Sequence, residues 1–204
     1  MTRMYASTNF PHCIDITCPA CRHRAEFEFG ETVQIKLKSD VTFFQDSRLF
    51  EYWKFTDHCG HHWHGAVYFE GLHGSPQRAI GALPAGYSAE DWNHPRYVRN
   101  RSEWPIGAFR CSHCHTRRIH LLRWPDDAFF SVSYRNHVLW AYHRESATAL
   151  LEYLTSSNRN MSGHGWTAFL LHVPTVFKVR KARDPVVKQL TTMLKPGGGQ
   201  RRSV

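Results

Sequence analysis

The sequence has no hydrophobic run long enough to cross a membrane. A spanning helix needs about 20 consecutive apolar residues, and no segment of the 204-residue chain approaches that length. The opening residues, MTRMYASTNFPHC, also lack the apolar core of a secretory signal. We therefore expect a cytoplasmic protein without a membrane partner.

The signatures of three common enzyme classes are missing as well. The chain contains no Gly-rich phosphate loop, no Gly-x-Ser-x-Gly nucleophile elbow and no dinucleotide-binding Gly-x-Gly-x-x-Gly pattern. These absences count against P-loop nucleotide hydrolases, α/β-hydrolases and nicotinamide-dependent dehydrogenases. They favour a protein that is not an enzyme, without excluding a less common enzyme class.

Acidic residues are scarce in the second half of the chain. Up to Phe109 there are 11 Lys and Arg against 12 Asp and Glu, whereas from Arg110 onward there are 15 against 5. The two parts carry −1 and +10, which sum to the net charge of +9. Such asymmetry predicts an anionic partner for the C-terminal half, either DNA or RNA or an acidic protein. The alternative is a solvated basic surface that binds nothing.

The basic residues are densest just before the last predicted helix, where four of them form a cluster: Lys178, Arg180, Lys181 and Arg183. This cluster predicts salt-sensitive contact with phosphates, without readout of the bases. Four more basic residues follow it: Lys188, Lys195, Arg201 and Arg202. A helix flank exposed only to water is the alternative interpretation.

Four of the six cysteines form two Cys-x-x-Cys pairs, Cys18 with Cys21 and Cys111 with Cys114. In a chain expected in a reducing compartment, such pairs indicate metal binding rather than disulfides. Each pair is half of a tetrahedral zinc site, and Zn²⁺ held by four thiolates forms a closed centre that stabilises a fold. The sequence therefore predicts one shared zinc site with these four ligands.

Both cysteine pairs stand next to predicted strands. CPAC precedes AEFEF, and GAFRCSHC precedes RRIHLL. Over residues 16–30 and 108–123 the chain thus resembles the zinc-ribbon and rubredoxin-like families, whose two metal knuckles are tight turns beside β-strands that share one ion. The resemblance implies a structural zinc. Residues 22–110 separate the knuckles, so the fold must bring them together.

Two other uses of the cysteines remain open. In the first, Cys18 and Cys21 take partners from Cys59, His61 and His62, while Cys111 and Cys114 recruit Cys13, His115 or His120. In the second, a pair is a redox dithiol, although the βαβ context expected for that chemistry is missing. If the shared site forms, Cys13 and Cys59 are expected to be small buried side chains or bystanders.

A histidine-rich run at residues 57–64 offers a different function. A metal-dependent hydrolase or nuclease would use its imidazoles: His58, His61, His62 and His64. The run lacks the His-Glu-x-x-His pattern, and in a strand His62 and His64 would share a face that His61 does not. It also resembles a ribbon knuckle in which Thr56 replaces the first cysteine. The remaining interpretation of this run is a set of turn and surface histidines. For the protein as a whole, a structural subunit of a larger assembly is a third possible function.

Alternating apolar residues predict a β-rich body. The alternation over residues 27–37 predicts a hairpin around Gly30, and segments 48–57 and 64–72 extend it into an antiparallel meander of about four strands. A further strand is expected at 117–124, followed by a hairpin that turns at Arg135 and Asn136. Residues 73–107, rich in Gly, Pro and Asn, are expected to form a long loop.

Two helices are predicted near the C-terminus. HRESATALLEYLTSS has apolar residues at helical spacing, and Asp184 with Pro185 signals the start of a second helix that stops at Pro196. We therefore predict an α+β fold, with a mainly antiparallel β body, a split zinc ribbon and a C-terminal helical pair. The expected parts are a β-rich domain at 1–142, a helical part at 143–196 packed on it, and a disordered tail at 197–204.

Overall fold

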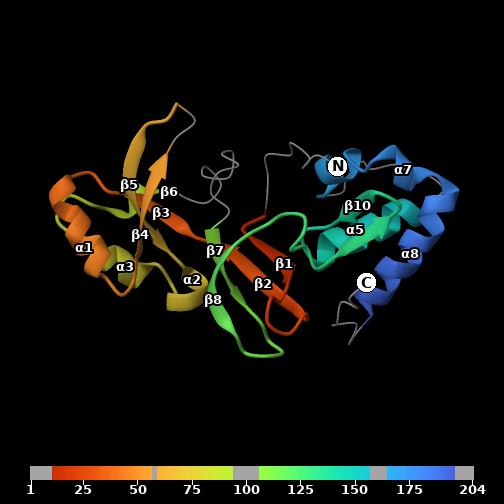
Figure 1. Ribbon diagram of the computed structural model, residues 1–204, viewed down its shortest axis with the longest axis horizontal. Coiled ribbons are helices and arrows are strands. Elements are labelled where there is room, and N and C mark those ends of the chain that lie inside the picture. The colour runs from red at the N-terminus through yellow and green to blue at the C-terminus, as the bar shows by residue number, and fades with distance from the viewer. Residues whose placement is uncertain (1–10, 57–58, 94–105, 157–164, 196–204) are drawn as a thin grey trace. The chain divides into compact units, whose positions relative to one another are not determined.

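The computed structural model describes residues 11–56, 59–93, 106–156 and 165–195. The chain divides into two compact units (Figure 1). The first comprises Met1–Phe27, Cys111–Thr116 and Arg123–Val204, and the second comprises Glu28–Arg110 and Arg117–Leu122. Helices and antiparallel sheets both occur, which confirms the predicted α+β class. The proposed boundary at residue 142 stays a prediction, and the tail at 197–204 lies outside the described residues.

The first unit combines one strand, one hairpin and the C-terminal helices. Its elements are β1 (Cys13–Thr17), β9 (Ser131–Tyr134), β10 (His137–Trp140), α5 (Arg144–Thr155), α6 (Thr167–Leu171), α7 (Thr175–Lys178) and α8 (Arg180–Leu194). Helix α5 packs against α8, and α8 also contacts β9 (Figure 1). The strands β9 and β10 pair antiparallel with Tyr134 opposite His137, so the turn falls on Arg135 and Asn136 as predicted.

Helix α5 confirms the helical spacing seen in the sequence, because Ala147, Leu150 and Leu154 are fully buried. Its first turn is closed by a capping box in which the backbone N–H of His143 donates to Ser146 Oγ at 3.0 Å. Such reciprocal bonds satisfy backbone groups that have no partner inside the helix. Local sequence and tertiary packing therefore agree on where α5 lies.

Helix α8 begins at Arg180, not at Asp184, and the predicted start is wrong. Ala182 and Val186 are completely buried and Leu190 almost completely, at a spacing of four residues, so packing fixes the helix from its first turn. Pro185 then lies inside the helix, where it forfeits one backbone hydrogen bond. Burial of the apolar stripe outweighs the local Asp-Pro start signal.

The second unit is built around a four-stranded sheet. In chain order its elements are β3 (Glu31–Gln34), η1 (Lys38–Asp40), α1 (Val41–Asp46), β4 (Glu51–Thr56), β5 (His62–Tyr68), α2 (Glu70–His73), α3 (Gln77–Gly81), η2 (Ala89–Asp91), β6 (Trp92–Asn93), β7 (Ile106–Arg110) and β8 (Arg117–Leu121). The sheet has the order β4-β5-β3-β6, and β7 pairs antiparallel with β8. β2 (Arg24–Phe29) spans the boundary between the units, in a sheet of order β1-β2-β7-β8.

The predicted hairpin around Gly30 and the simple meander are both wrong. β3 pairs with β5 and β6, whereas β2 belongs to the other four-stranded sheet. Gly30 is the residue at which the chain changes sheets, and a Cβ there would lie 2.4 Å from Val67 Cγ1. Alternation in the sequence correctly identified strands, but it carries no information about which strand is the neighbour.

The segment 73–107 contains more regular structure than a long loop. Helix α3, the 3-10 turn η2 and the short strand β6 fall within it, and residues 94–105 lie outside the described part. Ala79 of α3 is completely buried against the core of the unit, beside Phe44 and Tyr68. In the part of the chain that is described, no helix combines the length and apolarity required to span a membrane.

Candidate metal centre

The first cysteine pair lies in a tight turn between β1 and β2. The backbone N–H of Cys18 donates to the His23 carbonyl at 2.7 Å, and that of Arg22 donates to the Cys18 carbonyl at 2.9 Å. Arg22 has a φ of 66°, in the left-handed region that non-glycine residues rarely adopt. These bonds fold the six residues from Cys18 to His23 back on themselves, which turns both thiols to the same side.

The second pair repeats this geometry position by position. The backbone N–H of Cys111 donates to the Thr116 carbonyl at 3.0 Å, so the bond again joins the first cysteine to the residue five places on. His115 has a φ of 57° at the place that Arg22 takes in the first turn. The two turns are thus equivalent knuckles, although their sequences share only the cysteines.

The fold brings the four sulfurs of the two turns together. Cys18 Sγ lies 3.7 Å from Cys114 Sγ, and Cys21 Sγ lies 3.5 Å from Cys111 Sγ. All four sulfurs lie within 4.8 Å of one another. In a tetrahedral zinc site with Zn–S bonds of about 2.3 Å, sulfurs are about 3.8 Å apart. The four thiols therefore fit a single metal ion, and all of them belong to the first unit.

The surroundings of the thiols raise the pKa of some and lower that of another. Burial raises the pKa of Cys21 to about 12 and also raises that of Cys18, although backbone N–H groups oppose the shift at both. Hydrogen bonds from the Thr116 hydroxyl and backbone lower the pKa of Cys114 to about 6, and the hydroxyl oxygen lies 3.2 Å from Cys114 Sγ. Four thiolates cannot share so small a volume without a cation, which a divalent metal ion supplies.

The other predicted arrangements of the cysteines find no support among the described residues. In that part of the chain, no group able to hold a metal joins Cys18 or Cys21 to Cys59, His61 or His62. Cys59 is exposed and Cys13 is half-buried, so neither is the small buried side chain that was one of the two expectations for them. His115 and His120 belong to no such group either.

The histidine-rich run does not gather into a metal site where it is described. His62 Nδ1 and Thr56 Oγ1 are 2.8 Å apart, and His64 Nδ1 lies 2.6 Å from the Tyr52 hydroxyl. Each ring is therefore paired with a side chain of the neighbouring strand β4, and no candidate metal group among the described residues includes either one. His58 lies outside the described residues.

The predicted basic cluster lies where α7 ends and α8 begins. Lys178 is the last residue of α7, and its ammonium lies 5.8 Å from the centre of the Tyr153 ring. Arg180 and Lys181 are exposed in the first turn of α8. Arg183 is half-buried, with its Nε 3.9 Å from a carboxylate oxygen of Asp184. The sequence placed this cluster before the helix, whereas three of its members belong to the helix.

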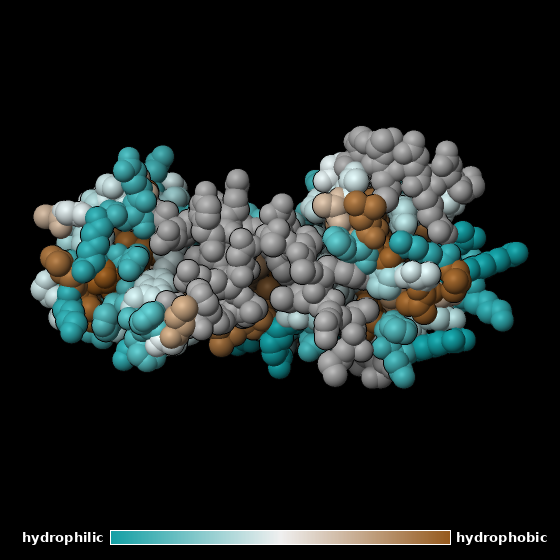
Figure 2. Space-filling view, turned by 90° about the horizontal axis from the view of Figure 1, so that it is seen from above, coloured by the Kyte–Doolittle hydropathy of each residue, from teal (hydrophilic) through white to brown (hydrophobic). Residues whose placement is uncertain are grey.

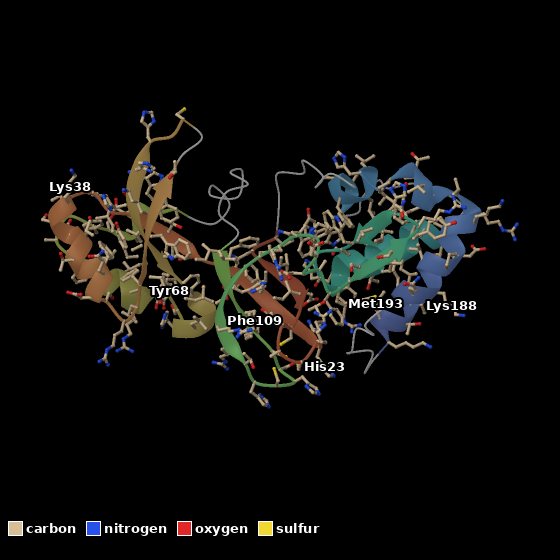
Figure 3. The ribbon with its side chains drawn as sticks, viewed as in Figure 1. His23, Lys38, Tyr68, Phe109, Lys188 and Met193 are labelled. Atoms are coloured by element: carbon tan, nitrogen blue, oxygen red, sulfur yellow. The ribbon has the colours of Figure 1, made fainter. Side chains whose placement is uncertain are left out.

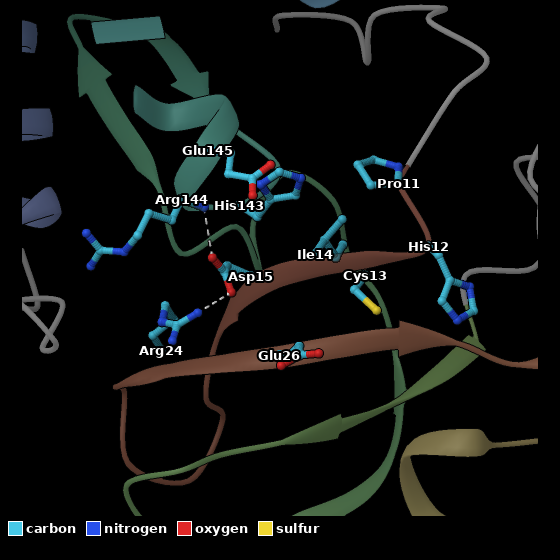
Figure 4. Close-up of a pocket in the computed structure, with 10 residues that line it drawn as sticks. All are labelled: Pro11, His12, Cys13, Ile14, Asp15, Arg24, Glu26, His143, Arg144 and Glu145. Carbon is cyan, nitrogen blue, oxygen red and sulfur yellow. Dashed lines mark hydrogen bonds and ion pairs between the residues drawn. The ribbon is translucent and has the colours of Figure 1, made fainter. Parts of the chain in front are cut away.

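A second feature of the first unit is an open cavity of about 530 Å³ beside the start of α5 (Figure 4). Asp15 from β1 is 3% exposed and accepts hydrogen bonds from Arg24 Nη1 at 2.8 Å and from the Arg144 backbone N–H at 3.0 Å. Burial raises its pKa, and Arg24 opposes that shift. The Arg144 guanidinium instead donates to the Leu194 carbonyl at 2.7 Å. Asp15 therefore anchors the first residue of α5 to β1.

Sequence reasoning missed Asp15, His23 and His113. Nothing in the local sequence marks a buried carboxylate that caps a helix 129 residues away. The two histidines did carry a signal, because one follows Cys21 by two residues and the other stands between Cys111 and Cys114. Attention to the residues inside and next to the knuckles would have found them.

Comparison with known proteins gives no relative. No protein-family model matches the chain, and neither curated proteins nor solved structures provide a match. The geometry of the site is therefore the only basis for a functional conclusion.

Proposed function

We propose that this chain is a zinc-stabilised binding module that contacts nucleic acid through its basic C-terminal half. The proposal rests on one observation above all: the sulfurs of Cys18, Cys21, Cys111 and Cys114 form a single cluster with spacings close to those of a tetrahedral zinc site. Such a site leaves no position for a substrate, which favours a structural role for the metal.

The repeated knuckle geometry supports a likeness to zinc-ribbon and rubredoxin-like sites. In each turn the backbone N–H of the first cysteine donates to the carbonyl five residues on, and the residue after the second cysteine has a positive φ. This conformation directs backbone N–H groups toward sulfur, as at Cys18, where Ala20 and Cys21 donate and lower its pKa against the effect of burial. N–H groups that point at sulfur stabilise thiolates and hence bound metal.

The start of α8 supports the choice of an anionic partner. The first turn of this 15-residue helix contains three basic residues and no acidic one. The helix dipole also places partial positive charge at that end, where acidic side chains are normally favoured. Basic side chains at a positive helix terminus stabilise the fold little by themselves, but they suit a bound phosphate.

Further basic residues continue the surface along α8. Lys181 and Lys188 are exposed and seven residues apart, which puts them on one face of α8, and the exposed Lys195 follows directly after the helix. Figure 3 shows Lys188 extending from the helix. In Figure 2, hydrophilic side chains project from the end on the right, where Figure 1 places α7 and α8. Positive charge spaced along a helix favours a phosphate backbone over a single small anion.

Binding to labelled single- and double-stranded DNA and RNA across salt concentrations tests the proposal. We expect affinity to fall steeply with salt, and the triple variant Arg180→Ala/Lys181→Ala/Lys188→Ala to flatten the slope of log K against log salt by up to about 3. The matched control Lys38→Ala/Lys54→Ala/Arg78→Ala removes equal charge from exposed positions of the second unit. Absence of binding at low salt, or equal effects of both variants, would refute the nucleic-acid proposal. An acidic protein partner, or a solvated basic surface that binds nothing, would then remain.

A further inference from the structure

A second group of metal-ligand side chains adjoins the four-cysteine cluster. The Cys21 sulfur and one nitrogen each from His23 and His113 lie within 4.8 Å of one another. All three residues belong to the first unit. The two histidines come from different knuckles, so the fold that gathers the cysteines also brings this trio together.

The two imidazole rings are held next to each other. Their centroids are 3.5 Å apart and the ring planes differ by 8°, which is a close parallel stack. In Figure 3, His23 lies at the turn between β1 and β2, near the sulfur atoms drawn in yellow. Because His113 sits between two cysteines of its own knuckle, its backbone is fixed by the same bonds that position the thiols.

His23 is also held in a tautomer that suits a ligand. Its Nδ1 lies 3.0 Å from the Cys21 carbonyl oxygen. A carbonyl oxygen only accepts, so Nδ1 donates and Nε2 of the neutral ring keeps its lone pair. Metal-binding histidines commonly donate their other N–H to a backbone carbonyl in this way, which fixes the ring orientation. The hydrogen bond thus prepares His23 for coordination.

Exposure distinguishes this trio from the four-cysteine cluster. The four-cysteine cluster has two buried members, Cys18 and Cys111, beside half-buried Cys21 and Cys114, whereas the trio has no buried member: Cys21 and His23 are half-buried and His113 is exposed. One thiolate and two imidazoles are ligands suited to Zn²⁺ and Co²⁺. Three protein ligands leave a fourth position for water, which is the arrangement of an open metal site rather than a closed one.

We propose that Cys21, His23 and His113 bind a second divalent transition-metal ion, with the Cys21 thiolate bridging it to the ion of the four-cysteine centre. The inference rests on the proposed zinc centre, because it shares that ligand. The rings tilt from their parallel stack on binding, so that both lone pairs converge on the ion. The second ion is exposed and exchangeable, whereas the first is enclosed.

Titration of the metal-free full-length protein with Co²⁺ tests this inference. We expect two equivalents to bind, the first giving the intense thiolate-to-cobalt absorption of a four-cysteine site and the second binding more weakly. In the variant His23→Ala/His113→Ala, the first equivalent remains and the affinity for the second falls at least about 100-fold, beyond what the loss of an outer-shell partner costs. The retained first equivalent shows that the variant is folded.

The matched control is His61→Ala/His62→Ala, which removes two exposed histidines of the second unit and should leave both equivalents intact. A single equivalent in the wild-type protein, or an unchanged second equivalent in His23→Ala/His113→Ala, would overturn the inference. Loss of the first equivalent in that variant would overturn it too, because the histidines would then belong to the first centre. Absence of any thiolate-bound cobalt in the wild type would instead refute the zinc centre itself.

Discussion

Arg22 and His115 occupy equivalent positions in the two cysteine turns, and both adopt left-handed backbone conformations, with φ of 66° and 57°. Each follows the second cysteine of its pair. Glycine is the residue that normally takes such a position, because a Cβ makes it unfavourable. Both turns therefore contain a strained backbone position, and the backbone hydrogen bonds that close each turn maintain this conformation.

Glycine should therefore stabilise either knuckle. We expect the free energy of unfolding of Arg22→Gly to be about 1 kcal/mol higher than that of Arg22→Ala. Alanine keeps the strain of a positive φ, whereas glycine adopts this conformation without strain. The same comparison applies at His115. Denaturant unfolding of the metal-loaded protein measures both differences. Equal stability of the Gly and Ala variants would show that neither backbone position is strained.

Loss of one cysteine from either turn should release the tightly held metal ion. Cys18→Ser and Cys111→Ser each replace a thiolate with a hydroxyl that does not ionise, so both variants should lose the ion and much of their stability. Cys59→Ser, at an exposed position, is the matched control and should retain it. Elemental analysis after a chelating column measures the content. Retention of metal in one of the two variants would mean that the turns bind separate ions.

Gly30 and Gly81 should respond oppositely to the same substitution. A Cβ at Gly30 would lie 2.4 Å from Val67 Cγ1 and 2.8 Å from Phe69 Cε1, so Gly30→Ala should destabilise the protein by about 1–3 kcal/mol. Gly81 ends α3 and a Cβ there meets nothing within 4 Å, so Gly81→Ala should be neutral or stabilising by up to about 1 kcal/mol. Thermal unfolding of both variants provides the comparison. A harmless Gly30→Ala would show that the Val67 and Phe69 side chains can move away from this residue.

The buried carboxyl of Asp15 should make stability depend on pH in a specific direction. Its pKa is raised above 3.8 in the folded protein, chiefly by burial, so the unfolded chain loses that proton at lower pH than the folded one does. As pH rises through this interval, ionisation favours the unfolded state, and the contribution of Asp15 to stability declines. Lowering the pH from neutral should therefore stabilise the wild type relative to Asp15→Asn.

Chemical unfolding of both proteins at a series of pH values measures this effect. The difference in unfolding free energy, wild type minus Asp15→Asn, should increase as the pH falls toward 3.8 and level off below it. The use of a difference cancels the protonation of the cysteines, which both proteins share. A difference that shrinks on acidification would show that Arg24 outweighs burial at this carboxyl.

The local features of this fold were predictable from short stretches of sequence. Helix α5 and the β9–β10 turn were predicted correctly because apolar spacing and turn residues act over a few positions. The start of α8 was not, because burial of Ala182 overrides the signal of Asp184 and Pro185. The neighbours of β3 were also predicted wrongly, since strand pairing depends on contacts made by residues that are distant in the sequence.

The sequence by itself determined that the chain carries two cysteine turns of metal-binding spacing, and that positive charge accumulates after the second. Only the tertiary structure decided that Cys18 lies 3.7 Å from Cys114, across 96 positions of chain. The tertiary structure alone also placed the His23 and His113 rings in contact. Ligand spacing is set by the covalent chain within a turn, but the meeting of two turns depends on the packing of everything between them.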